Sequence, residues 1–312
     1  MSNSFVHTSS LMGTVVTFQV IGHGGTKDER VERAAAVERA VGWFEQMTAM
    51  CSRFLPGSEL TQLSEHVGEF VPVSALLFEA VQFALSVAEV TDGAFDPTVG
   101  HRMELRGFSR EFRSGRAVHV DIAGDGVASY RDVVLDPDRR TITLLRPLLL
   151  DLGAVAKGMA IDLAARELQP FRNFAIDAGG DLYLGGGNAQ GEPWKVGIRH
   201  PRHKNTLIDT LRVSDAAVCT SGDYERRQKT DPGIHHILDA RIGETAAALA
   251  SATVVAPTAM AADALSTAAF VLGATGGVDL LEHEGVEGLL FTPTLERFAT
   301  RGMRTEHLGA PR

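Results

Sequence analysis

The chain has 312 residues, of which 44% are hydrophobic, so it can bury a large core in one domain or in two closely packed lobes. A net charge of −9 and a pI near 5.7 argue against nucleic acid or an anionic membrane surface as its main partner. Cys51 and Cys219 form neither a disulfide framework nor a zinc motif, and no secretory signal or run of about 20 apolar residues is visible. We therefore expect a cytoplasmic protein without membrane insertion.

The first half of the chain predicts both helices and strands. β-Branched residues predict a strand over 11–21, and apolar residues at helical spacing predict helices over 28–50 and 76–90. The stretch 118–150 alternates polar and apolar residues, which is typical of strands. Residues 151–168 begin as a small-residue turn and continue as a helix.

The second half is richer in predicted strands. These cover residues 174–187 with a glycine bend, 194–198, 207–220 and 251–255, and residues 235–240 are extended. Helices are predicted from 257 to about 272 and over 278–284, followed by a terminal hairpin over 287–301. The mixture predicts an α+β fold with antiparallel sheets, not the strict alternation of a Rossmann fold.

Residues 151–162, DLGAVAKGMAID, combine a small-residue turn, a helix start and Lys157. Small residues let the backbone approach a ligand, and the free N–H groups at a helix N-terminus bind anions. The segment therefore suggests a phosphate cradle. The alternative is a plain strand–turn–helix connection with a surface lysine, and the segment alone favours neither interpretation.

Asp263 and Thr267 are four residues apart in a predicted apolar helix, so they share one face of it. With Ser266 they offer hard oxygen ligands of the kind that Mg²⁺ prefers. The alternative, which these residues alone favour, is an acid stabilised in the first helical turn and a threonine that bonds back to a carbonyl.

Other polar residues have similar alternatives. His235 and His236 are adjacent in an extended segment, so at most one enters a given pocket, where it could accept a proton; otherwise they form a surface pair. Asp96 is either a turn acid or a ligand contact. Asp177 and Asp181 flank a glycine pair and are expected to cap a tight bend.

Eight motifs follow one another in a fixed order: LMGTVV, FDPTVG, DLGAVAKGMAID, DAGGDLYLGG, WKVGIRHP, TSGDYER, HHILDARIG and SATVVAPTAMAADALSTAAFVLG. Together, over about residues 11–273, they resemble the ApbE family of FAD:protein FMN transferases. The resemblance implies a single T-fold-related α+β domain over residues 1–312, with antiparallel sheets and flanking helices. It also implies an active-site cleft between two intimate lobes.

The resemblance implies an enzyme that binds FAD with Mg²⁺ and attaches FMN through a phosphoester to a threonine or serine of a target flavoprotein, releasing AMP. Two alternatives share the same binding residues. One is a Mg²⁺-dependent FAD diphosphatase that gives free FMN and AMP, and the other is a non-catalytic FAD-binding protein.

Single residues receive roles from the same resemblance. Lys157 and His236 would be catalytic, with the histidine assisting transfer. The magnesium site would use the Ala154 carbonyl with Asp263 and Thr267, and Ser266 as a further ligand. The flavin-binding positions would be Met12, Phe54, Ala94, Phe95, Asp96, Asp151, Lys157 and Ile237.

A few positions depart from the family's pattern. Arg106 stands where the family has a tryptophan, and Phe54 stands where it usually has a tyrosine. Ala240 and Ile242 change the family's DPRTG loop to DARIG. We expect contacts to the flavin or to the acceptor protein to differ at these places.

Overall fold

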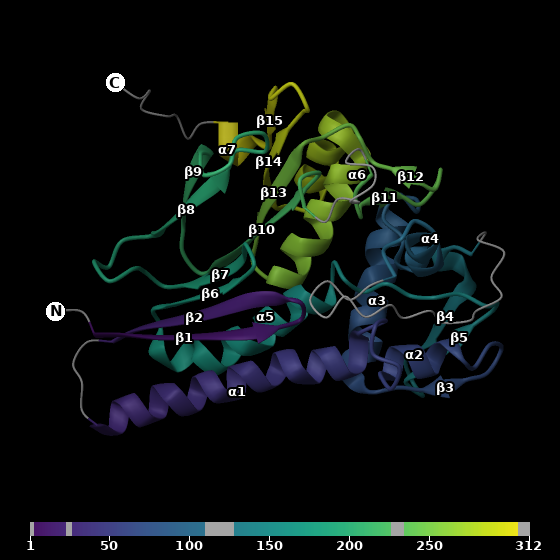
Figure 1. The fold of residues 1–312 in the computed structure, drawn as a ribbon, viewed down its shortest axis with the longest axis horizontal. Coiled ribbons are helices and arrows are strands. Elements are labelled where there is room, and N and C mark those ends of the chain that lie inside the picture. Colours follow the sequence, from purple (N-terminus) through teal and green to yellow (C-terminus); the bar gives the residue numbers. More distant parts are fainter. Residues whose placement is uncertain (1–2, 23–26, 110–127, 226–233, 305–312) are drawn as a thin grey trace.

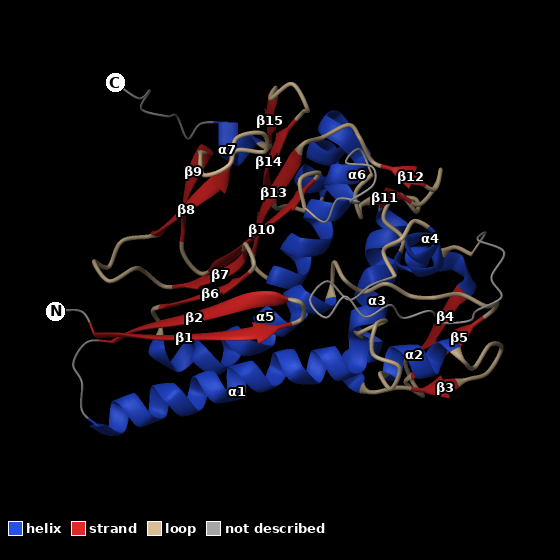
Figure 2. Ribbon diagram, viewed as in Figure 1, coloured by secondary structure: helices blue, strands red, loops and turns tan. Residues whose placement is uncertain are grey.

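The computed structural model describes residues 3–22, 27–109, 128–225 and 234–304. A large sheet with helices beside it forms one end of the molecule, and a small sheet with further helices forms the other (Figure 1). Strands and helices are mixed along the chain, and the strands of each sheet pair antiparallel (Figure 2). The predicted α+β class is confirmed, whereas the extent of the domain and the cleft between lobes stay predictions.

The large sheet has eight strands in the order β1-β2-β6-β7-β10-β13-β14-β15. The smaller sheets are β3-β5-β4 and the pairs β8-β9 and β11-β12. The bounds are β1 (Asn3–Leu11), β2 (Thr14–Gly22), β3 (Val71–Pro72), β4 (Val133–Asp136), β5 (Thr141–Leu144), β6 (Phe174–Ala178), β7 (Asp181–Gly185), β8 (Trp194–Arg199), β9 (Leu207–Val213), β10 (Ala216–Gly222), β11 (Leu238–Asp239), β12 (Glu244–Thr245), β13 (Ser251–Ala256), β14 (Glu287–Phe291) and β15 (Arg297–Ala299).

Some helices pack beside the large sheet, and others, one of them 16 residues long, lie with the small sheet at the other end (Figure 1). Their apolar side chains and those of the large sheet meet in one continuous core that includes Phe18, Phe44 and Phe270. The helices are α1 (Lys27–Cys51), α2 (Glu59–Ser64), α3 (Ala75–Val90), α4 (Gly100–Leu105), α5 (Ala156–Leu168), α6 (Ala259–His283) and α7 (Arg301–Arg304).

The strand predicted over 11–21 is wrong at its start. Leu11 ends β1, and Met12 and Gly13 form the hairpin turn to β2 with φ of 46° and 75°. Positive φ is costly for a methionine, so tertiary contacts hold this turn. Strand β1 was not predicted from the sequence, because its polar segment NSFVHTSS has few β-branched residues. Of the predicted strands over 118–150, residues 118–127 lie outside the described residues.

Helix α6 is interrupted at Gly273, whose φ of 78° and ψ of −172° are not helical. This agrees with the predicted end near residue 272 and with a second helix after it. By length and composition, α6 is the one helix in the described ranges that could cross a membrane, contrary to the expectation from the sequence. However, 67% of its most apolar window is buried in the fold, which is the pattern of a core helix.

Two residues of α5 fix the start of α6. A Cβ at Gly158 would lie 2.4 Å from the Ala259 carbonyl oxygen, so only glycine allows this approach of the two helices. One turn later, the Asp162 carboxylate accepts hydrogen bonds from the N–H groups of Ala259 (2.7 Å) and Met260 (2.9 Å). The beginning of α6 is therefore held against the beginning of α5.

Candidate active site

Lys157 lies in the first turn of α5 and donates hydrogen bonds to two buried carboxylates. Its Nζ contacts Oδ2 of Asp263 on α6 at 2.9 Å and Oδ2 of Asp181 at the start of β7. One ammonium between two carboxylates leaves a net charge of −1 in a site that solvent barely reaches. Such a site attracts a further cation.

Three separate segments create this cluster. Gly158 and Asp162 bring α5 to the first turns of α6 and thereby place Lys157 beside Asp263. Asp181 opens β7, and its Oδ1 accepts a hydrogen bond from the Thr220 N–H of β10 at 3.3 Å. The sheet and the two helices therefore each contribute one charged group.

Hydroxyl groups continue the site along α6. Ser221 on β10 lies 2.9 Å from the Ser266 hydroxyl and 3.0 Å from the Thr267 hydroxyl. Ser266 also donates to the Asp263 carbonyl at 2.9 Å. The bond back to a carbonyl that we expected from the threonine is thus made by the serine.

The predicted magnesium ligands fit a divalent cation by their chemistry. A buried carboxylate, hydroxyl groups and a nearby turn carbonyl are hard oxygen donors, and the carboxylate of Asp263 already contacts a cationic group. Ala154 lies in the turn just before α5, the helix that packs on α6. Among the described residues, no group of three or more His, Cys, Asp and Glu side chains could hold a metal ion, so hydroxyl and carbonyl oxygens would have to complete the site.

The Met12 turn lies at the same end of the sheet as Asp181. A Cβ at Gly179 would lie 2.1 Å from the Thr14 hydroxyl, so the glycine bend between β6 and β7 packs directly on the β1–β2 turn. Met12 itself is partly buried against the core. The structure therefore brings one predicted flavin residue close to the lysine cluster.

A second group of predicted residues surrounds Asp151. Arg53, which is 4% exposed, donates its Nε–H to Asp151 Oδ2 (2.7 Å) and an Nη2–H to the Phe108 carbonyl (2.7 Å). Its guanidinium lies 4.1 Å from the centroid of the Phe54 ring. Asp151 also accepts from the Gly153 N–H, so it anchors the turn that leads to Lys157.

The loop that contains Ala94, Phe95 and Asp96 runs beside Asp151, whose N–H donates to the Pro97 carbonyl at 2.7 Å. Asp96 accepts from the N–H and hydroxyl of Thr98 and from the Tyr130 N–H. Burial raises the pKa of Asp96, and these hydrogen bonds oppose the rise. The turn-acid interpretation is confirmed, while its contact with a flavin stays a prediction.

The two adjacent histidines face different surroundings. His235 is buried, with its Nε2–H donating to the Ala246 carbonyl (2.9 Å), its Nδ1 accepting from the Ile237 N–H (3.3 Å) and its ring edge-on to Phe270. His236 is only partly buried. That at most one of them enters a given pocket stays a prediction. Ile237 is buried beside them.

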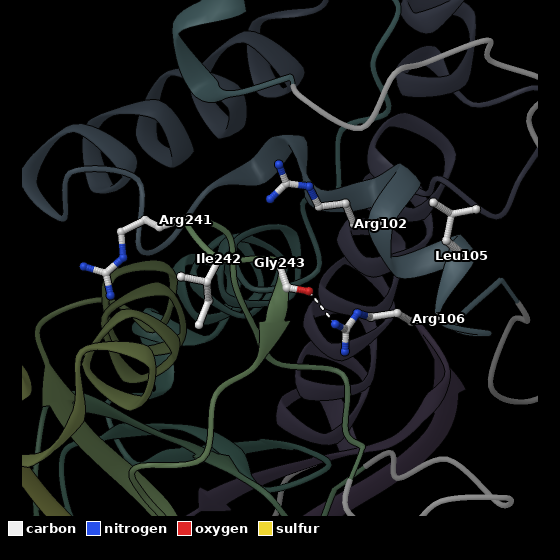
Figure 3. A pocket seen from close by; sticks show the side chains of 6 residues that line it. All are labelled: Arg102, Leu105, Arg106, Arg241, Ile242 and Gly243. Atoms are coloured by element: carbon white, nitrogen blue, oxygen red, sulfur yellow. Dashed lines mark hydrogen bonds between the residues drawn. The ribbon is translucent and has the colours of Figure 1, made fainter.

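The segment that contains Arg106 contacts the segment that contains Ala240 and Ile242. Arg106, the residue that follows α4, donates to the Gly243 carbonyl (2.5 Å) and to the Thr245 hydroxyl (3.3 Å). Arg102 on α4 donates to the Ala240 carbonyl. Figure 3 shows Arg102, Arg106 and Gly243 around a surface pocket that Leu105, Arg241 and Ile242 also line. The altered helix and the altered hairpin β11-β12 are therefore one interlocked unit.

Neither cysteine is placed for thiolate chemistry. Cys51 and Cys219 are both free and buried. Burial, with a smaller effect of Glu59, raises the pKa of Cys51 to about 12, and burial raises that of Cys219 well above its ordinary value. The absence of a disulfide between them agrees with the sequence.

The sequence analysis did not predict the contacts that Asp181, Asp162 and Arg53 make at the candidate site. Asp177 caps the glycine bend through the Gly180 N–H, as expected, but the same prediction for Asp181 is wrong, because Asp181 pairs with Lys157. Asp162 could have been found, since it follows Gly158 by four residues on one helix face. Nothing local to Arg53 pointed to Asp151, which lies 98 positions away.

Comparisons with known proteins agree with this architecture. The model of the ApbE family matches residues 12–290. The FAD:protein FMN transferase of Haemophilus influenzae is 27% identical over 306 residues, which cover 93% of this chain and 87% of that protein. The FAD:protein FMN transferase of Treponema pallidum is 31% identical, with 89% and 83% covered.

Solved structures show the same fold. The ApbE protein from Thermotoga maritima matches with a TM-score of 0.82 at 29% identity, covering 97% of this chain and 98% of its own. The flavin transferase ApbE from Vibrio cholerae matches with a TM-score of 0.81 at 25% identity, covering 97% and 99%. The fold and the oxygen-rich site thus define an α+β protein of the flavin transferase type. The chain belongs to the ApbE family.

Proposed function

We propose that this protein is an FAD:protein FMN transferase, which moves FMN from FAD to a threonine or serine of a target flavoprotein. The observation that carries the proposal is the buried cluster of Lys157, Asp181 and Asp263 beside the Thr267 hydroxyl. Such a cluster can balance the charge of a diphosphate once a divalent cation has joined it. The relatives with this fold that are named as FAD:protein FMN transferases support the assignment.

In the proposed reaction, the acceptor hydroxyl oxygen forms a bond to the phosphorus of the FMN half of FAD. The bond from that phosphorus to the bridging oxygen breaks, and AMP leaves with the electron pair. His236 would take the proton of the hydroxyl, and Lys157 would donate a hydrogen bond to a phosphate oxygen whose negative charge grows.

The proposal includes Mg²⁺, held by Asp263 and Thr267 with the Ala154 carbonyl and Ser266. When bound, Mg²⁺ neutralises diphosphate charge and stabilises the leaving phosphate. Asp151, held by Arg53, would orient the turn that carries Ala154 and Lys157.

The remaining parts of the proposal concern location and partners. We place the enzyme and its acceptor in the cytoplasm, which suits two buried cysteines that form no disulfide. Flavin contacts are assigned to Met12, Phe54, Phe95 and Ile237. The side chain of Ala94 faces the core, so any contact from it would come from its backbone.

One incubation tests the reaction. The protein, FAD, Mg²⁺ and a candidate acceptor flavoprotein are mixed, and the acceptor is analysed by mass spectrometry. We expect a mass increase of one FMN on the acceptor and an equal amount of AMP. Free FMN without an acceptor adduct would instead favour the diphosphatase, and intact FAD would favour binding alone.

Replacing Asp263 tests the metal assignment. Asp263→Ala removes the one carboxylate of the predicted ligands, so we expect FMN transfer to fall by at least about 100-fold. Asp279→Ala is the matched control, because Asp279 is an exposed acid on the same helix. Transfer by Asp263→Ala at the rate of the control would overturn the metal site.

A further inference from the structure

The environment of Lys157 suggests a role for Asp181 that the resemblance does not assign. Lys157 contacts two carboxylates at once, one on α6 and one on β7. Asp263 is a predicted metal ligand, whereas Asp181 is not. If Lys157 kept both ion pairs when a metal bound, its ammonium would compete with the metal for an oxygen of Asp263.

We propose that Asp181 is a positioning residue, which retains Lys157 in the site when the ammonium leaves Asp263 and a divalent cation takes that carboxylate. The inference rests on the proposed function. Lys157 thus serves as the counter-ion of Asp263 before the metal binds, and as a phosphate ligand held by Asp181 afterwards.

The geometry of Asp181 suits this role. Its side chain is 11% exposed, and its Oδ1 is fixed by the Thr220 N–H of β10, which leaves Oδ2 aimed at the lysine. Because β7 and β10 are paired strands in the middle of the large sheet, the carboxylate has a rigid base. A rigid acceptor keeps a flexible lysine in one place at low cost in side-chain entropy.

Charge leads to the same conclusion. The three groups carry a net charge of −1, which a divalent cation changes to +1. Without Asp181, the site would be neutral before the metal binds, and Lys157 would have Asp263 as its remaining carboxylate partner among those described. The ammonium would then compete directly with the metal.

A double-mutant cycle on metal binding tests the proposal without requiring turnover. Mn²⁺ is titrated by calorimetry into four proteins without FAD: the natural protein, Asp181→Asn, Lys157→Gln and the variant with both changes. We expect Asp181→Asn to weaken Mn²⁺ binding at least about fivefold when Lys157 is present. In the Lys157→Gln background, where no ammonium competes, the effect of Asp181→Asn should be at least about threefold smaller.

Equal weakening in both backgrounds would overturn the proposal, because Asp181 would then act through its charge or as a ligand. Asp177→Asn is the matched control, since Asp177 is an exposed acid on the other side of the same glycine bend. It should bind Mn²⁺ as the natural protein does, and weakening as large as that of Asp181→Asn would also overturn the proposal.

A second measurement covers the case in which Lys157→Gln does not fold. The affinity for FAD at saturating Mg²⁺ is measured by flavin fluorescence for Asp181→Asn and Asp177→Asn. We expect Asp181→Asn alone to bind FAD at least about fivefold more weakly, because Lys157 is no longer held toward the phosphates. Equal FAD affinity in the two variants would refute the role. A protein that binds Mn²⁺ and FAD as expected but transfers no FMN would disprove only the proposed function.

Discussion

His235 and His236 differ in what surrounds their rings, and this difference separates a structural histidine from one that can act in transfer. The hydrogen bonds of His235 fix its neutral tautomer with the proton on Nε2 and use both ring nitrogens. His236 is partly exposed as a residue, although its Nδ1 is buried. We therefore propose His236, and not His235, for chemistry at this position.

His236→Ala should leave FAD binding within about twofold of that of the natural protein and slow FMN transfer by about 100-fold or more, because the acceptor hydroxyl loses its proton acceptor. Binding is measured by flavin fluorescence and transfer by mass spectrometry of the acceptor. His235→Ala serves as the contrast and should lower the free energy of unfolding by about 1–3 kcal/mol. Full transfer by His236→Ala would remove the histidine from the mechanism.

At the scale of elements, the contact of α5 with α6 is the feature on which the site depends. Gly158 permits the approach, and Asp162 caps the first N–H groups of α6. Burial raises the pKa of Asp162 from an ordinary 3.8 to about 6, although the two N–H groups and Arg166 oppose the rise. The folded state therefore binds the proton of Asp162 more tightly than the unfolded state does.

The sign of the resulting pH dependence follows from linkage. Because the pKa of Asp162 is higher in the folded state, its contribution to stability is fully present below pH 3.8 and is lost as the pH rises through 6. We expect the free energy of unfolding of the natural protein, relative to that of Asp162→Asn, to be about 2 kcal/mol smaller at pH 7 than at pH 4.5. Urea denaturation at the two pH values measures the free energy of unfolding of both proteins. A difference between the two proteins that does not change with pH would contradict the raised pKa.

At the scale of the whole molecule, α4 and the hairpin β11-β12 meet although they are more than 130 positions apart. In the sequence, Arg106 is far from Ala240 and Ile242, and each change alone predicts a difference in contacts to the flavin or to the acceptor protein. The structure shows that Arg102 and Arg106 donate to hairpin carbonyls, and that Arg241 pairs with Asp239. Although burial opposes it, the hydrogen bonds from Arg241 lower the pKa of Asp239.

Arg106→Ala should loosen this hairpin. Losing the bonds to Gly243 and Thr245 costs about 1 kcal/mol locally, so we expect amide hydrogen exchange over residues 238–245 to quicken about fivefold. Mass spectrometry of the exchanged peptides measures it. Arg131→Ala is the control, because Arg131 makes an exposed ion pair with Asp92 and should leave this exchange unchanged. If the exchange rate over residues 238–245 were the same in Arg106→Ala as in the natural protein, other contacts would be holding the hairpin.

Local features of the sequence determined much of this protein. Apolar patterns predicted helices at α1, α3, α5 and α6, and the predicted end near residue 272 coincides with the break in α6. The order of the motifs indicated the family. These signals are local because helix and strand preferences act over a few residues. Strand β1 was not predicted because its polar residues carry little such signal.

Only the tertiary structure decided how the charged groups are paired. Asp177 and Asp181 have the same local surroundings in the sequence, yet one caps a bend and the other pairs with Lys157. Arg53 and Asp151, and likewise Lys157 and Asp263, come together across about a hundred residues. The partner of a buried charge is set by which segments the core brings together, and burial then makes that pairing obligatory.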